Sequence, residues 1–241
     1  MKCFIGIDGC RAGWFTFSLF EDLTWALKVF PNIQEIWRNL SNAEILLIDI
    51  PIGLRDEGPE ERKCDVEARQ LLGQPRASSV FTPPCRPALD FETREEASEM
   101  NHRLTGRRIG AHTWGIVPKI REVDRFLRTT PEAREQIREI HPEVFFWAHN
   151  GRASMSHNKK RLEGFVERLR VLRRHFPQCD ELVMDALTEF PRNQAGKDDI
   201  LDALAAAVTG MYGSSRLVSI PKDPERDSEG LPMEMVYYAK D

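Results

Sequence analysis

The chain has 241 residues, of which 41% are hydrophobic and 30% are charged, and its formal net charge is −4. This balance predicts one soluble α/β domain over residues 1–241, and it excludes a strongly basic protein that binds nucleic acid by charge alone. The five cysteines are odd in number and lack C-x-x-C spacing, so neither a disulfide framework nor a zinc site is expected. Since no signal peptide and no long apolar run is found, we expect a cytoplasmic protein that does not enter a membrane.

The first predicted elements form a β-hairpin that carries an acid. A buried strand at residues 4–7 ends in Asp8, and glycines in the following turn lead into a second strand at 15–20. A third strand is predicted at 25–30, and a short helix at 33–40 is capped by Asn32.

The next strand, at residues 45–48, is almost continuously apolar, as expected of a strand that is covered on both faces. It also ends in an acid, Asp49. If strands 4–7 and 45–48 lie side by side, Asp8 and Asp49 are neighbours at one end of a sheet.

Residues 57–135 are predicted to form a helical insertion that covers one end of the sheet. Helices are expected at 60–72, 93–104 and 120–127, and a proline-rich loop connects the first two. The segment 139–147 then returns to the sheet as a partly irregular strand, which would place Glu143 at a strand edge.

Three helices are predicted in the last third of the chain, at residues 158–175, 179–190 and 197–208. The last is rich in alanine and carries Asp199 and Asp202, which are three residues apart and share a face. Apolar residues flank Asp202, so its carboxylate is costly to bury unless it is paired or bound to a metal. An acidic loop at 221–230 and a final strand at 233–238 complete the expected elements.

These acids form a candidate site for two divalent ions. Such sites hold ions ~3.5–4 Å apart and hydrolyse phosphodiesters, and Mg²⁺ prefers hard oxygen ligands. The predicted catalytic residues are Asp8, Asp49, Asp199, Asp202 and Glu143; the four aspartates would bind Mg²⁺ or Mn²⁺, with Asp8 shared between the ions and Glu143 in an outer position. Each acid alone is equally typical of a turn, a helix cap or a solvated surface.

Basic residues near these acids are candidates for phosphate binding. They are Arg11 after the first strand, Arg76 in the proline-rich loop, Lys119 before the helix at 120–127, and Lys160 in the basic run at 159–161. A solvated charged face is the alternative explanation for such a run.

Residues 5–14 and 199–205 resemble the first strand and last helix of ribonuclease H-like nucleases, and the Holliday-junction resolvase branch is nearest. Nearly the whole chain resembles the DUF429 family, predicted nucleases of that fold. The matching stretches are residues 6–14, 49–53, 76–86, 118–120, 141–143, 159–160, 198–206 and 229–232. The resolvase branch usually has a glutamate where Asp49 stands here.

The resemblance implies an α/β, ribonuclease H-like fold: a mixed five-stranded sheet with strand order 3-2-1-4-5 and helices on both faces. It also implies metal-dependent hydrolysis of DNA or RNA, so nucleic acid is the expected partner, and a homodimer is left open. Two other classes are weighed against it. A phosphotransferase or ATPase of the sugar-kinase and actin-like class needs two such halves, and a non-catalytic module that binds nucleic acid or protein would be expected to lose the acids.

Overall fold

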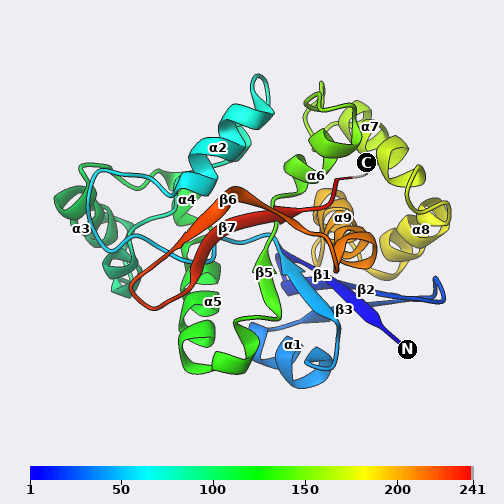
Figure 1. Cartoon of the computed structure of the whole chain (residues 1–241), viewed down its shortest axis with the longest axis horizontal. Coiled ribbons are helices and arrows are strands. Elements are labelled where there is room, and N and C mark those ends of the chain that lie inside the picture. The colour runs from blue at the N-terminus through cyan, green and yellow to red at the C-terminus, as the bar shows by residue number, and fades with distance from the viewer. Residues whose placement is uncertain (240–241) are drawn as a thin grey trace.

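A mixed five-stranded sheet forms the centre of the computed structural model, which describes residues 1–239 (Figure 1). The strand order is β3-β2-β1-β4-β5, which confirms the predicted order. Neighbours on the β3 side pair antiparallel, whereas β1–β4 and β4–β5 pair parallel. The strands are β1 (Cys3–Cys10), β2 (Gly13–Phe20), β3 (Trp25–Phe30), β4 (Ile45–Ile48) and β5 (Ile137–Glu139).

Helices cover both faces of the sheet, as expected. Alternate residues of β1 point to opposite faces, so Ile5 and Ile7 pack against α1 (Ile33–Leu40) and α5 (Val117–Thr129). The predicted cap of α1 is confirmed, since the Asn32 side chain accepts a hydrogen bond from the Glu35 N–H at 2.9 Å.

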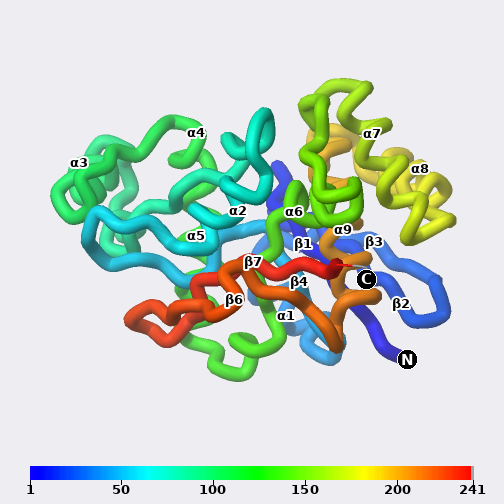
Figure 2. Tube along the Cα trace, turned by 45° about the horizontal axis from the view of Figure 1, so that its top comes forward, coloured from blue at the N-terminus to red at the C-terminus, as the bar shows by residue number. Residues whose placement is uncertain are grey.

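The opposite face of the sheet is covered by the helices of the last third of the chain. The buried α9 lies directly on β1, β2 and β4, and the other three helices share its apolar core. Figures 1 and 2 show α7 and α8 on the right of the molecule. These helices are α6 (Pro142–His149), α7 (Leu162–Arg173), α8 (Cys179–Glu189) and α9 (Lys197–Gly213).

Between β4 and β5 the chain forms the predicted helices, with boundaries that differ by a few residues. They are α2 (Lys63–Leu72), α3 (Arg94–Thr105) and α5, whereas the short α4 (Ala111–Trp114) and the 3₁₀ turns at Ala77–Ser79, Arg86–Asp90 and Pro131–Ala133 were not predicted. In the views of Figures 1 and 2, α3 lies on the far left, opposite α7 and α8. Within residues 1–239, no helix is long and apolar enough to cross a membrane.

The expected strand at 139–147 is wrong over most of its length. Only Glu139 belongs to β5, and a helix begins at Pro142. Proline suits the first turn of a helix because its missing N–H has no intrahelical partner there. Glu143 therefore lies in the first turn of α6 and not at a strand edge.

The expected loop at 221–230 is also wrong in large part. Residues Val218–Arg226 form β6, which pairs antiparallel with β7 (Pro232–Tyr237) in a separate two-stranded ribbon. The pairing register shifts between Ile220 and Glu225, and such an irregular edge accommodates proline, which cannot donate to a ladder. The helix expected to begin at 158 begins at Leu162 instead, because residues 158–161 form a turn.

Candidate metal centre

The register of β1 against β4 makes Asp8 and Asp49 neighbours. Ile7 pairs with Ile48, and the Asp49 N–H donates to the Ile7 carbonyl at 3.0 Å. One residue further along, the two acids occupy equivalent positions, and both fall on the sheet face that α9 covers. Asp8 lies within β1 and not beyond it, because the hairpin with β2 continues to Cys10 after the pairing with β4 has ended.

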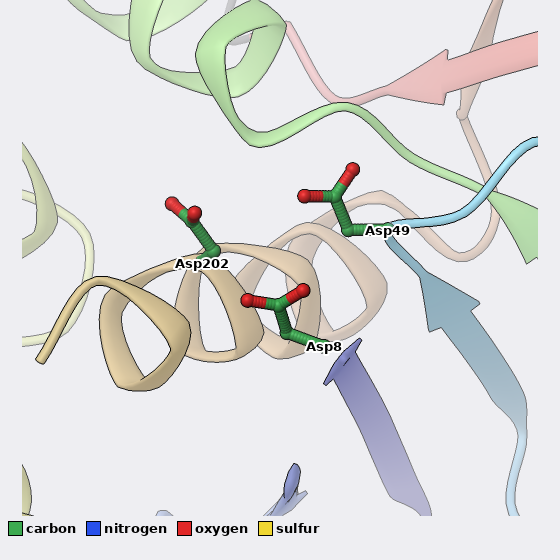
Figure 3. A group of neighbouring side chains, drawn as sticks. All are labelled: Asp8, Asp49 and Asp202. Atoms are coloured by element: carbon green, nitrogen blue, oxygen red, sulfur yellow. The ribbon is translucent and has the colours of Figure 1, made fainter. Parts of the chain in front are cut away.

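Helix α9 brings a third carboxylate to the same place. A Cβ atom at Gly6 would lie 1.9 Å from the Ala203 carbonyl oxygen, so only glycine lets α9 approach β1 this closely. Asp202, which precedes Ala203, is thereby held beside Asp8 and is only 1% exposed. Figure 3 shows the two side chains from β1 and α9 together with that of Asp49, which follows β4.

The three aspartates form a donor set that could hold a metal ion. Each offers one carboxylate oxygen, and the three oxygens lie within 4.8 Å of one another. Asp202 Oδ1 is buried and has no hydrogen-bond partner, which leaves an unsatisfied acceptor on a member of the triad. Buried polar atoms are normally satisfied, so this atom calls for a ligand. Carboxylate oxygens are the hard ligands that magnesium and similar cations prefer.

Asp199 lies outside this triad, although it was expected beside Asp8 and Asp49. Its Oδ2 accepts the Gly196 N–H at 2.8 Å and so caps the first turn of α9, where Asp198 also lies. Asp199 lines the same cavity as the triad and precedes Asp202 by three residues on α9. The structure thus uses Asp202 as the third acid of the cluster.

Burial and mutual repulsion perturb the acids strongly. Burial raises the pKa of Asp8 well above its usual range, and the neighbouring Asp49, Asp202 and Asp199 raise it further. Burial, followed by the charge of Asp202, raises the pKa of Asp49 to about 7, and burial raises the pKa of Asp199 to about 6. Each raised pKa means that the ionised form of the carboxyl group is disfavoured by its surroundings. A bound cation would favour the ionised form, because it would offset the negative charge of the neighbouring acids.

Lys159, which belongs to the basic run at 159–161 from which Lys160 was chosen as the phosphate contact, already contacts the cluster. The Lys159 ammonium group forms an ion pair with Asp202 Oδ2. Burial alone would lower the pKa of Lys159, but Asp202, Asp8 and Asp49 raise it above its ordinary value. The sequence could not predict which of the two adjacent lysines, Lys159 or Lys160, contacts the triad, because the conformation of the turn decides which side chain points inward.

Glu143 is close to the cluster but is engaged by an arginine. Its Oε1 accepts from Arg168 Nε at 3.1 Å and from the same guanidinium again, while its Oε2 is buried without a hydrogen-bond partner. The fully buried Arg168 also donates to the carbonyls of His157 and Gly164. Glu143 therefore joins α6 to α7 at the border of the site.

The triad lies in a cavity of about 540 Å³, whose walls come from the sheet end, the residues between β4 and β5, and the turn before α7. Of the predicted phosphate contacts, Arg76, Lys119 and Lys160 line this cavity. Arg76 Nε is buried without a partner. Arg11 lies in the exposed β1–β2 turn and is not among the lining residues in the described part of the chain.

Lys119 differs from the other basic residues of the cavity because its side chain already makes contacts that hold the fold together. Its ammonium donates to the Gly13 carbonyl and lies 4.2 Å from the centre of the Trp14 ring. Its side chain also packs against Gly9, where an added Cβ would lie 2.7 Å from Lys119 Cδ. Lys119 thus fixes the β1–β2 turn beside Asp8, whatever else it binds.

Comparison with known proteins identifies the family. A family model described as "Protein of unknown function (DUF429)" matches residues 6–226, a span that contains the sheet, the triad and β6. No curated protein and no solved structure matches the chain. Because the family model covers most of its length, the chain belongs to the DUF429 family.

Proposed function

We propose that this protein is a nuclease of the ribonuclease H-like fold that hydrolyses phosphodiester bonds of DNA or RNA with Mg²⁺ or Mn²⁺. The observation that carries the proposal is the buried aspartate triad with its unpartnered Asp202 oxygen. The strand order and the position of α9 across β1 and β4 agree with the fold that the sequence resemblance implies.

Asp8, Asp49 and Asp202 would hold the ions, and Asp8 would be the ligand that the ions share. Bound divalent ions activate water and neutralise charge on the leaving oxygen. Asp199 lines the same cavity and would become available as a further ligand only if its cap to Gly196 opened. Arg76 and Lys160, which line the cavity, would hold the phosphate, and Arg168 keeps Glu143 from swinging into the triad.

The cavity favours a flexible strand or a strand end as substrate. Its volume of about 540 Å³ falls within the ~300–1,000 Å³ of small-molecule pockets. The loop after α2 contributes Ser78, Ser79 and Phe81 to the cavity wall, and a base could stack on the ring of Phe81. An intact duplex is wider than such a pocket, so the scissile phosphate would enter on an unpaired segment.

The test is a cleavage panel of single-stranded DNA and RNA, duplexes, branched junctions and ATP, each with Mg²⁺ or Mn²⁺. We expect slow cleavage of unpaired nucleic acid that a chelator abolishes. Asp8→Asn should remove the activity, whereas Asp22→Asn, in the exposed β2–β3 turn and outside the lining of the cavity, should retain it. ATP turnover without nucleic-acid cleavage would favour the phosphotransferase class, and cleavage that survives Asp8→Asn would refute the assigned site.

A further inference from the structure

Lys159 occupies a position that a cation would otherwise take. Its ammonium contacts Asp202 Oδ2, and the charges of Asp8 and Asp49 act on it as well. One ammonium group faces three carboxylates, so it neutralises only part of their charge. The second oxygen of Asp202 remains without a partner.

The turn that carries Lys159 is fixed by α7. The Ser156 and His157 N–H groups donate to the Glu167 carboxylate at 2.8 and 2.9 Å, and Arg168 donates to the His157 carbonyl at 3.1 Å. A Cβ atom at Gly164 would lie 2.1 Å from the Asn158 carbonyl oxygen, so a glycine is required where the turn meets the helix. The backbone is therefore held in place, and the ammonium of Lys159 can move only by rotation of its side chain.

The side chain of Lys159 has room for that rotation. It is 34% exposed and lines the same cavity as the triad and Arg76. Four flexible methylene groups let a lysine ammonium move several ångströms without a backbone change, and an ammonium binds a phosphate as readily as a carboxylate. The ion pair with Lys159 leaves Asp202 Oδ1 without a hydrogen-bond partner, so Lys159 does not saturate this carboxylate.

We infer that Lys159 couples metal binding to phosphate binding: it pairs with Asp202 while the site lacks ions and turns to the substrate phosphate when ions are bound. This inference rests on the proposed function. Since Lys159 and a divalent cation compete for Asp202, metal should bind weakly alone and more tightly once a phosphate attracts the lysine away. The coupling is reciprocal, so metal should strengthen phosphate binding by the same factor.

The test measures Mn²⁺ affinity by electron paramagnetic resonance of the free ion, with and without adenosine monophosphate as the phosphate probe. We expect Lys159→Met to bind Mn²⁺ roughly tenfold or more tightly than the wild type without the nucleotide, because two cationic charges a few ångströms apart repel strongly. Adenosine monophosphate should strengthen Mn²⁺ binding several-fold in the wild type and hardly at all in Lys159→Met. The matched control is Lys222→Met, since Lys222 is an exposed lysine of β6 that is not among the lining residues of the cavity in the described part of the chain.

Unchanged or weaker Mn²⁺ binding in Lys159→Met would overturn the inference, as would a nucleotide effect equal to that of the wild type. If circular dichroism shows that Lys159→Met does not fold, Lys159→Gln removes the charge but keeps a donor for Asp202. Cleavage is measured separately on the same proteins. If Lys159→Met changes the coupling between Mn²⁺ and nucleotide binding but no protein cleaves nucleic acid, the role of Lys159 is retained and the nuclease activity is refuted. If the wild type cleaves nucleic acid but Lys159→Met leaves the coupling unchanged, only the role of Lys159 is refuted.

Discussion

Two clusters of largely buried acids contribute to the wall of the same cavity, and their hydrogen bonds are satisfied to very different degrees. In the first, the guanidinium of Arg62 lies between Asp65 and Glu139, and all three side chains are nearly inaccessible. In the second, Asp8, Asp49 and Asp202 share the single ammonium of Lys159. The two clusters therefore differ in how many donors each buried acid finds.

Every nitrogen of Arg62 is engaged. Nε and the terminal nitrogen Nη2 donate to the Asp65 carboxylate. Both terminal nitrogens donate to the Glu139 carboxylate, and Nη1 also donates to the carbonyls of Ile52 and Gly53. The Ile52 N–H completes the shell of Glu139 at 2.7 Å. This cluster ties β5 to the chain that leaves β4, and nothing in it calls for a ligand.

The aspartate triad, by contrast, keeps an unpartnered oxygen and an excess of negative charge. Folding brings these acids together at a cost, since burial and repulsion raise the pKa of Asp8 and Asp49. The comparison teaches that burial of acids alone does not mark a functional site. The unpartnered oxygen together with the crowding of three carboxylates is what makes the triad, and not the Arg62 cluster, the candidate site.

The largest expected effect comes from breaking the saturated cluster. Arg62→Met should lower the free energy of unfolding by roughly 3–5 kcal/mol, because it leaves Asp65 and Glu139 buried without their common partner. Urea unfolding followed by circular dichroism measures the change. A loss below about 1 kcal/mol would mean that the cluster is not the structural element described here.

Asp8→Asn should, in contrast to Arg62→Met, reduce the activity without lowering the stability of the protein. It removes a ligand charge without changing size, so the metal-dependent activity should fall at least about 100-fold, more than an outer-shell partner of a metal typically contributes. The metal-free variant should remain folded and melt at the same or a higher temperature, because one repelling charge is gone. Calorimetry without metal checks this point, and an unfolded Asp8→Asn would instead identify Asp8 as a structural turn residue.

The pH dependence of stability separates the two clusters. A carboxyl group whose pKa is raised on folding binds more protons in the native state, so stability is lost as pH rises from about 4 towards 7. Burial raises the pKa of Asp8 and Asp49, and also that of Glu139 to about 7. The melting temperature of the metal-free protein should therefore fall between pH 5 and pH 8, by roughly 2–4 °C per kcal/mol lost.

Mg²⁺ should recover only the part of this loss that belongs to the triad, because a cation favours the charged aspartates and does not reach the saturated Glu139. Melting curves at both pH values with and without Mg²⁺ measure the two parts. Full recovery, or none, would contradict the division between the clusters.

Asp199 should give the smallest effect. Asp199→Ala removes the acceptor for the Gly196 N–H and should cost about 1 kcal/mol of stability, as for other helix caps. Asp199→Asn keeps an acceptor oxygen and should be nearly neutral in stability, with a smaller loss of activity than Asp202→Asn. Equal losses of activity for the two variants would place Asp199 among the metal ligands after all.

The sequence predicted the parts of the site that depend on strand order. Asp8 and Asp49 each follow a short apolar strand, and parallel neighbours place such positions at one edge of a sheet. The choice between Asp199 and Asp202 was beyond sequence, because the two share a helix face and the depth of α9 along β1 decides which one reaches the triad. That depth depends on the contact of Ala203 with Gly6, a tertiary feature.

Three other points required the structure for different physical reasons. The buried aromatic run after Pro142 fits a strand or a helix equally well, because an element covered on all sides loses its periodicity. Strand β6 runs through the prolines of segment 221–226 because they lie in the irregular stretch between Ile220 and Glu225, where no ladder partner is needed. The inward turn of Lys159 depends on hydrogen bonds to α7, whose residues lie several positions further along the chain.

The contact between Gly6 and Ala203 sets the distance between β1 and α9 as well as the position of Asp202 along β1. Since α9 rests directly on the backbone of β1, the separation of Asp202 from Asp8 is fixed by main-chain spacing and not by flexible side chains. Mg²⁺ demands oxygens at about 2.0–2.1 Å, whereas Ca²⁺ accepts about 2.3–2.6 Å and more ligands. If the triad holds a divalent ion as proposed, a side chain at residue 6 would widen the gap between strand and helix and should move the preference of the site from the smaller ion towards the larger.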